Sequence, residues 1–195
     1  MTVAPVAHTP RATLTPLRVL ALAMTTTLAA LAHNPAQAQS YAPTGAFVQV
    51  GAGENELKTL TAGAVWQCAC LQGLLGGRVD GYLEANLGYW NVRGVNGRSS
   101  YGSVAVVPMF RYRFDQGRSP WFVEAGIGAV LTDRLYETRS KRFSTALNFS
   151  DNVAVGYRLS PRDEVSLRVQ HISNASFKKP NPGENFVQVR YAFSY

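Results

Sequence analysis

The residues from Glu164 to Ser173 read EVSLRVQHIS, and up to position 169 every second side chain is apolar. Because successive side chains of a β-strand point to opposite faces, the apolar residues share one face, which His171 and Ser173 continue. If that face meets water, a His and a Ser are unremarkable there. If it meets lipid, each polar group without a partner costs several kcal/mol. The interpretation of this stretch therefore depends on which solvent its face contacts.

Seven other stretches show the same alternation, with turns that are alternately short and longer between them. Several exceed the length of about five or six residues that is usual for strands of soluble proteins. Long alternating strands joined in this way predict an eight-stranded antiparallel transmembrane β-barrel. The alternative is a soluble barrel with its apolar face inward. The seven stretches cover residues 47–52, 57–66, 79–89, 104–114, 121–131, 147–159 and 186–195.

Aromatic residues flank several of these stretches, as in the interfacial girdles of membrane barrels, and the last one ends at Tyr195. With both ends of the barrel in the periplasm, the strand from Glu164 rises outward and places His171 and Ser173 at the outer leaflet. Side chains fill the small interior of eight strands, so we expect no pore. Asp151 interrupts the apolar face of its stretch, which indicates a bulge or the membrane edge.

The first 38 residues have the features of a secretory signal peptide. Arg11 and Arg18 precede an apolar run at residues 19–32, and residues 36–38 (Ala-Gln-Ala) form a small-x-small cleavage site. The apolar run is too short for a membrane-spanning helix. We therefore expect an exported protein whose residues 39–195 form a barrel domain in the outer membrane of a Gram-negative bacterium.

The charge and the cysteines limit the partners of the chain. It carries 19 basic and 12 acidic residues, a balance that suits anionic lipid or lipopolysaccharide phosphates. Export and the lack of a basic helix argue against nucleic acid. Cys68 and Cys70 are the only cysteines, and without clustered histidines they do not form a zinc site. We expect them to be structural or incidental, and an oxidising compartment leaves a disulfide open.

The segment after the alternating face carries a longer motif. It reads His-x-Ser-Asn-Ala at residues 171–175, then a lysine-bearing segment, then Asn-Pro-Gly at residues 181–183. This string resembles the motif of the outer-membrane lipid A 3-O-deacylase (PagL) family and is far more specific than a His-x-Ser pair alone. The resemblance implies hydrolysis of the ester at position 3 of lipid A, with release of a 3-hydroxy fatty acid and with no metal or cofactor.

Within the motif, Ser173 is the expected nucleophile and His171 its base, because a free hydroxyl needs an activator. Their Cβ atoms would lie roughly 6–7 Å apart on one strand face. Glu184, the only carboxylate after His171, is expected to orient the imidazole. It is out of phase with the apolar face of the last strand, whereas Asn185 is in phase, so this role requires a bulge after Gly183. Asn185 is the alternative, and some family members place the acid one residue later.

The remaining motif residues have both a functional and an ordinary interpretation. The oxyanion of the tetrahedral intermediate needs N–H donors, and the resemblance points to Asn174. Backbone groups near Ala175 and Ser176 are further candidates, and the ordinary interpretation of Asn174 is a strand-end or bulge residue. Lys178 and Lys179 are expected either to bind phosphates of the glycolipid or to be solvated loop charges.

Composition and spacing by themselves support only a lipid-facing Ser-His ester hydrolase on a barrel. The resemblance supplies the substrate, lipid A of lipopolysaccharide, and the position of the cleaved ester. The alternative from another class is a non-catalytic structural or adhesive outer-membrane barrel, although the loops are short for an adhesive surface. A homodimer is left open by the sequence.

Overall fold

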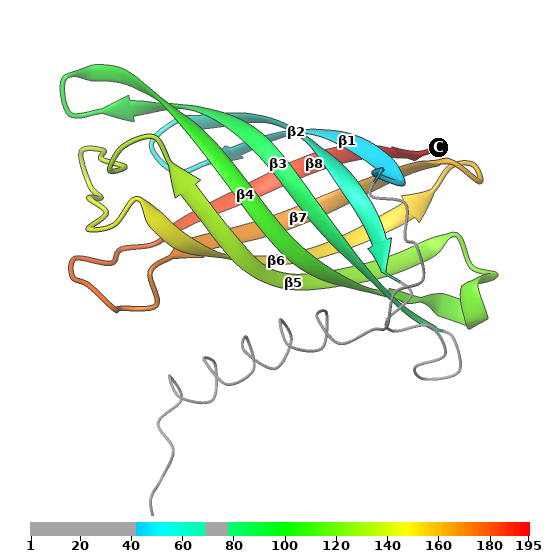
Figure 1. Cartoon of the computed structure of the whole chain (residues 1–195). Helices are drawn as coiled ribbons and strands as arrows, with labels where there is room; N and C mark the ends of the chain where they lie inside the picture. The colour runs from blue at the N-terminus through cyan, green and yellow to red at the C-terminus, as the bar shows by residue number, and fades with distance from the viewer. Residues whose placement is uncertain (1–41, 69–77) are drawn as a thin grey trace, which may run out of the picture. The chain divides into compact units, whose positions relative to one another are not determined.

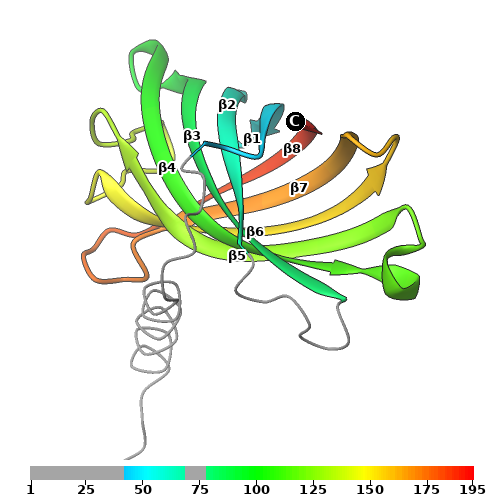
Figure 2. The same cartoon turned by 45° about the vertical axis from the view of Figure 1, so that its right-hand side comes forward.

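The computed structural model describes residues 42–68 and 78–195, whose strands close into one antiparallel barrel (Figures 1 and 2). Each strand pairs with its neighbour in sequence, and β1 pairs with β8 to close the cylinder. The predicted eight-stranded antiparallel barrel is confirmed. The strands are β1 (Gly45–Gly53), β2 (Leu57–Cys68), β3 (Val79–Gly94), β4 (Gly97–Arg113), β5 (Trp121–Thr132), β6 (Leu147–Arg158), β7 (Asp163–Ser173) and β8 (Glu184–Ser194).

The β3–β4 hairpin is longer than the alternation of apolar residues predicts. Trp90 and Val92 still point inward and are buried, but Asn91 and Arg93 occupy the outward positions. An apolar outer face therefore ends before the backbone pairing does. The β3–β4 turn lies at the same end of the barrel as the β7–β8 loop (Figure 1).

The two faces of the wall show which solvent the apolar side chains meet. Val50, Leu87 and Val153 point outward and are 56%, 67% and 57% exposed. Glutamates, arginines and amides point inward and are buried. A soluble barrel would have the opposite arrangement, so that alternative is wrong. The apolar outer wall is the surface that a membrane barrel presents to lipid.

Paired charges fill the middle of the barrel. Glu84 accepts hydrogen bonds from Arg168 at 2.7 Å and from Arg190 at 2.6 Å, and Arg111 lies 2.6 Å from Glu124. All five side chains are buried. Because each charge has a hydrogen-bonded partner of opposite sign, the network offsets its own desolvation. It joins β3, β4, β5, β7 and β8 across the lumen.

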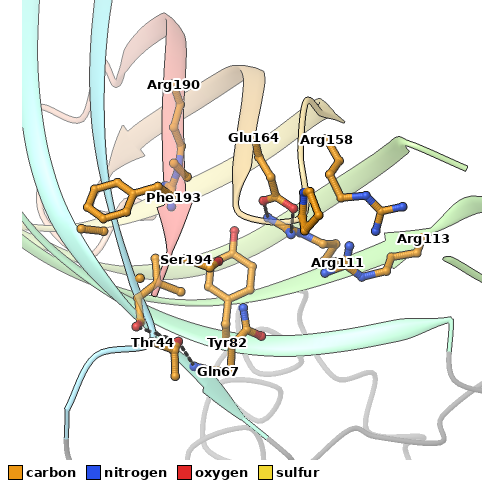
Figure 3. Close-up of a pocket in the computed structure, with 15 residues that line it drawn as sticks. Thr44, Gln67, Tyr82, Arg111, Arg113, Arg158, Glu164, Arg190, Phe193 and Ser194 are labelled. Carbon is orange, nitrogen blue, oxygen red and sulfur yellow. Dashed lines mark hydrogen bonds and ion pairs between the residues drawn. The ribbon is translucent and has the colours of Figure 1, made fainter. Parts of the chain in front are cut away.

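The two ends of the barrel differ. At the end that holds Gly45 and Ser194, a cavity of about 180 Å³ opens into the lumen. Figure 3 shows Arg111 and Glu164 side by side among its lining residues, and these side chains lie 2.8 Å apart. At the opposite end, loop 133–146 and loop 174–183 connect the strands. The described part of the chain contains no helix of the length and apolarity that a membrane span needs.

Two predictions fall on residues that the structure does not describe. The expected signal peptide, residues 1–38, lies within residues 1–41, and Cys70 lies within residues 69–77. Cys68, at the end of β2, is disulfide-bonded.

Candidate active site

Strand β7 brings His171 and Ser173 to the outer wall. They lie near the end of the barrel opposite the one that holds Gly45 and Ser194. Ile172 between them points into the lumen and is fully buried. Both motif side chains are half-buried, whereas Val169 below them on the same face is 46% exposed. The placement predicted from the alternation, on the outside of the cylinder, is therefore the one that the strand adopts.

The imidazole of His171 is held from the neighbouring strand. Its Nδ1 lies 2.7 Å from Oδ1 of Asn185, the residue directly opposite it on β8. An amide oxygen only accepts, so this bond assigns the proton to Nδ1. Nε2 is then unprotonated and can accept a proton from a nucleophile.

Ser173 lies two residues after His171 on the same face, at the point where β7 ends. The backbone N–H of Ala175 points to its Oγ at 3.5 Å. Within the part of the chain that the structure describes, Ser173 and His171 form no direct hydrogen bond. Catalytic hydrogen bonds are often long before substrate binds and tighten in the complex, and one side-chain rotation spans the distance between neighbours on a strand face.

Glu184 does not reach His171, which corrects the expected orienting role. It pairs with Ile172, without a bulge, and its side chain is fully buried inside the barrel. Gly183 closes the preceding loop with φ +66°, and pairing begins at the very next residue. There is no extra residue that could form a bulge and reverse the inward and outward positions. Glu184 therefore points into the lumen, and Asn185 points outward on the same side of the wall as His171.

Inside the barrel, Glu184 anchors loop 133–146. It accepts a hydrogen bond from the Tyr136 hydroxyl at 3.0 Å and lies 3.5 Å from Nζ of Lys141. Burial, and then the nearby Glu184 carboxylate, raise the pKa of Tyr136 well above its usual range. The hydroxyl therefore stays protonated and donates. This contact fixes the loop to the end of the barrel next to the site.

Asn174 also turns inward, so its side chain is not the oxyanion donor that we expected. Its Nδ2, with two hydrogens to donate, lies within hydrogen-bond distance of three acceptors: Ser144 Oγ at 2.9 Å, Thr145 Oγ1 at 3.2 Å and the carbonyl of Lys178 at 2.8 Å. These bonds tie loop 174–183 to the loop before β6. Ala175 has φ +51°, which bends the chain at the end of β7. The N–H group found beside Ser173 is that of Ala175.

Lys178 and Lys179 lie exposed in loop 174–183, on the side of the barrel end that carries the site. Neither ammonium group has an ion-pair partner among residues 42–68 and 78–195. Both charges are therefore free to meet an anionic group, and their role in binding phosphate stays a prediction.

The structure adds one residue that sequence reasoning left without a role. Asp151 on β6 lies directly opposite His171, in a register that is unbroken from Phe149 to Arg158. The interruption of the apolar face is therefore not a bulge, and its interpretation as the membrane edge stays a prediction. The signal that could have identified Asp151 is its phase: it shares the outward face with Phe149 and Val153.

Comparison with known proteins assigns the family. A model of the lipid A 3-O-deacylase (PagL) family matches residues 60–194. The chain belongs to this family. Over 119 residues it is 33% identical to lipid A deacylase PagL of Bordetella bronchiseptica, and over 107 residues 33% identical to the PagL of Pseudomonas aeruginosa. These matches cover 61% and 55% of this chain, and 65% and 60% of the relatives, in both cases less than two thirds of their length.

A solved structure shows the same arrangement of strands. The crystal structure of the outer membrane enzyme PagL superposes with a TM-score of 0.65 at 27% sequence identity. The match covers 77% of this chain and 99% of that one. The resemblance read from the motif and the outer-membrane localisation are confirmed by these comparisons.

Proposed function

We propose that the protein is a lipid A 3-O-deacylase, a carboxylic ester hydrolase that acts from the outer wall of its barrel. The observation that carries the proposal is the placement of Ser173 beside His171 on the lipid-facing surface, with the imidazole held through Nδ1 by Asn185. Ester bonds of a membrane glycolipid lie at the border between its headgroup and its acyl chains. A nucleophile near the top of a lipid-facing strand is at the depth where such bonds lie.

The reaction follows from these groups. Ser173 Oγ attacks the ester carbonyl carbon while Nε2 of His171 takes its proton. The Ala175 N–H, which already faces Oγ, is placed to donate to the oxyanion of the tetrahedral intermediate. When the intermediate collapses, His171 returns the proton to the leaving sugar oxygen. Water then attacks the acyl-serine by the same proton path, and a 3-hydroxy fatty acid leaves.

The surface below the site suits an acyl chain. The next outward residues on the two strands that carry Asp151 and His171 are Val153 and Val169, which pair with each other. They line an apolar hollow of about 550 Å³ on the outer wall, with Ala125 of β5 leaving space between larger neighbours. An acyl chain that lies in this hollow can place its ester carbonyl at Ser173. Lys178 and Lys179 lie on the headgroup side.

The test is incubation of the purified barrel with lipopolysaccharide, followed by mass spectrometry of lipid A. We expect loss of one 3-hydroxyacyl chain with the natural protein and none with Ser173→Ala or His171→Ala. Ser119→Ala, at the opposite end of the barrel, is the matched control and should keep full activity. Heat-modifiable mobility in detergent gels reports whether each variant is folded.

Two outcomes contradict the proposal. Unchanged lipid A after incubation with a folded natural barrel would favour the non-catalytic structural or adhesive barrel. Deacylation that persists in a folded Ser173→Ala barrel would show that another group performs the chemistry.

A further inference from the structure

Asp151 is a carboxylate on the part of the wall that faces lipid. On β6 its outward neighbours are Phe149 and Val153, and the side chains between them point into the lumen. Ionisable side chains at such positions are destabilising and rare in membrane barrels. An acidic residue on this face therefore calls for a physical reason.

Packing and hydrogen bonding do not supply that reason. Among residues 42–68 and 78–195, no hydrogen bond or ion pair involves the Asp151 carboxylate. The buried acids Glu84, Glu124 and Glu184, in contrast, all have donors inside the barrel. Asp151 thus stands on the other side of the wall from the charge network and contributes nothing to it.

The register shows what Asp151 does face. It is the residue directly opposite His171 on β6, as Asn185 is on β8, so the three side chains form a row across three adjacent strands. Side chains that are directly opposite in an antiparallel pair have Cβ atoms about 4.5–5.5 Å apart. The imidazole therefore lies between a neutral amide on one side and a carboxylate on the other.

This row has a consequence for the reaction. When Nε2 takes the proton of Ser173, the ring becomes an imidazolium while Nδ1–H stays bonded to the amide of Asn185. An amide carries no formal charge to offset that cation. Glu184 cannot do so either, because it lies inside the barrel beside Lys141. Asp151 is the carboxylate on the same face as the cation.

We propose that Asp151 is a positioning residue of the active site: its carboxylate, set opposite His171 across the β6–β7 pair, offsets the charge of the imidazolium as the serine is activated. This inference rests on the proposed function. In this role the Asp151 carboxylate acts through its charge when the imidazolium forms and takes no proton from it. The task that one acid usually performs is divided here between Asn185, which orients the ring, and Asp151, which supplies the negative charge.

The first test is Asp151→Asn, which keeps the shape of the side chain and removes its charge. We expect kcat for deacylation to fall roughly 10- to 100-fold, the size of a screened charge–charge attraction at this separation, with little change in KM. The rate at which a small fluorophosphonate labels Ser173 should fall by a similar factor, because that reaction needs the activated serine but no lipid A. Asp151→Glu should keep most of the activity.

A purely structural role for Asp151 predicts a different pattern. Removing an unpaired carboxylate from a lipid-facing wall should leave the barrel as stable as before or more stable, as measured by the temperature of the gel-mobility shift. Lower kcat in a barrel of unchanged or higher stability supports the proposal. Lower kcat that follows a loss of folded barrel contradicts it.

The double variant Asp151→Asn/Asn185→Asp gives an independent answer. It moves the carboxylate from one neighbour of His171 to the other, where it bonds Nδ1 directly. We expect this variant to recover at least tenfold over Asp151→Asn alone. Glu184→Gln, which neutralises a carboxylate on the inner side of the same wall, is the matched control and should keep natural kcat.

The outcomes separate the two proposals. If Asp151→Asn has natural kcat and a natural labelling rate, Asp151 has no part in activating Ser173, whereas the deacylase function stands. If Ser173→Ala and His171→Ala leave deacylation intact, the proposed function itself fails, whatever Asp151 does. A double variant that is no better than Asp151→Asn also contradicts the charge role.

Discussion

Substituting the adjacent residues 184 and 185 one at a time tests which side of the wall orients the catalytic imidazole. Asn185→Ala removes the acceptor that holds Nδ1 of His171 at 2.7 Å. The ring then loses its fixed orientation, and a polar N–H is left without a partner at a lipid-facing position. An unsatisfied group of this kind costs about 1–3 kcal/mol, and each 1.36 kcal/mol is about a tenfold change in rate. We therefore expect kcat to fall roughly 5- to 100-fold.

Glu184→Gln should have the opposite profile. The amide oxygen can still accept from the Tyr136 hydroxyl, while the 3.5 Å ion pair with Lys141 and the 3.3 Å hydrogen bond from the Asn185 N–H to Oε1 are lost. Lys141 keeps Glu54 as a partner at 3.0 Å. We expect a loss of stability of about 1–2 kcal/mol, from the weakening of one partly buried pair, with kcat within about twofold of the natural value.

Both variants can be followed with the same two measurements. Mass spectrometry of released 3-hydroxy fatty acid from lipopolysaccharide in detergent micelles gives kcat and KM. Urea titration of the gel-mobility shift gives the free energy of unfolding. If Glu184→Gln loses tenfold in kcat while Asn185→Ala is unaffected, Glu184 orients the imidazole, and β8 pairs with β7 one residue away from the register that sets Asn185 opposite His171.

Three further substitutions probe the site and its scaffold. Gly183→Ala would place a Cβ 2.6 Å from Cε1 of His171 at a backbone with φ +66°, so deacylation should fall at least about tenfold in a barrel that still shows its gel-mobility shift. Glu84→Ala leaves Arg168 and Arg190 buried without their shared acceptor, and urea unfolding should show a loss of about 3–5 kcal/mol. Ala125→Trp fills the apolar hollow, so mass spectrometry should show slower release of long acyl chains than of short ones; equal slowing of both would contradict an acyl chain in the hollow.

The alternation of apolar and polar side chains along the strands was enough to predict most of the fold. Apolar side chains at every second position predicted the strands, and their placement on the outer wall follows because the inward positions hold charges that need partners. The same period also places His171 and Ser173. The alternation did not predict the end of the β3–β4 hairpin, where polar residues continue the backbone pairing outside the apolar band.

The errors in the site concern single residues near turns. Glu184 has the chemistry of an orienting acid but lies out of phase with the outward face, and the structure follows the phase, because the chain re-enters the sheet immediately after Gly183. Asn174 lies one step past the last outward residue of β7 and therefore points inward to the loops. Asp151 had no assigned partner because contacts between strands depend on register, which the length of the turn at residues 159–162 sets.

Strand β7 serves two compartments with one backbone. Arg168 holds the acid of the internal network while His171, three positions on, faces the membrane. A deletion or insertion of one codon between them would swap inside and outside for everything downstream, exposing the motif to the packed interior. Such a strand tolerates substitution of individual residues but not an insertion or deletion. Proteins that descend from this one should therefore differ in the residues of β7 and hardly ever in its length.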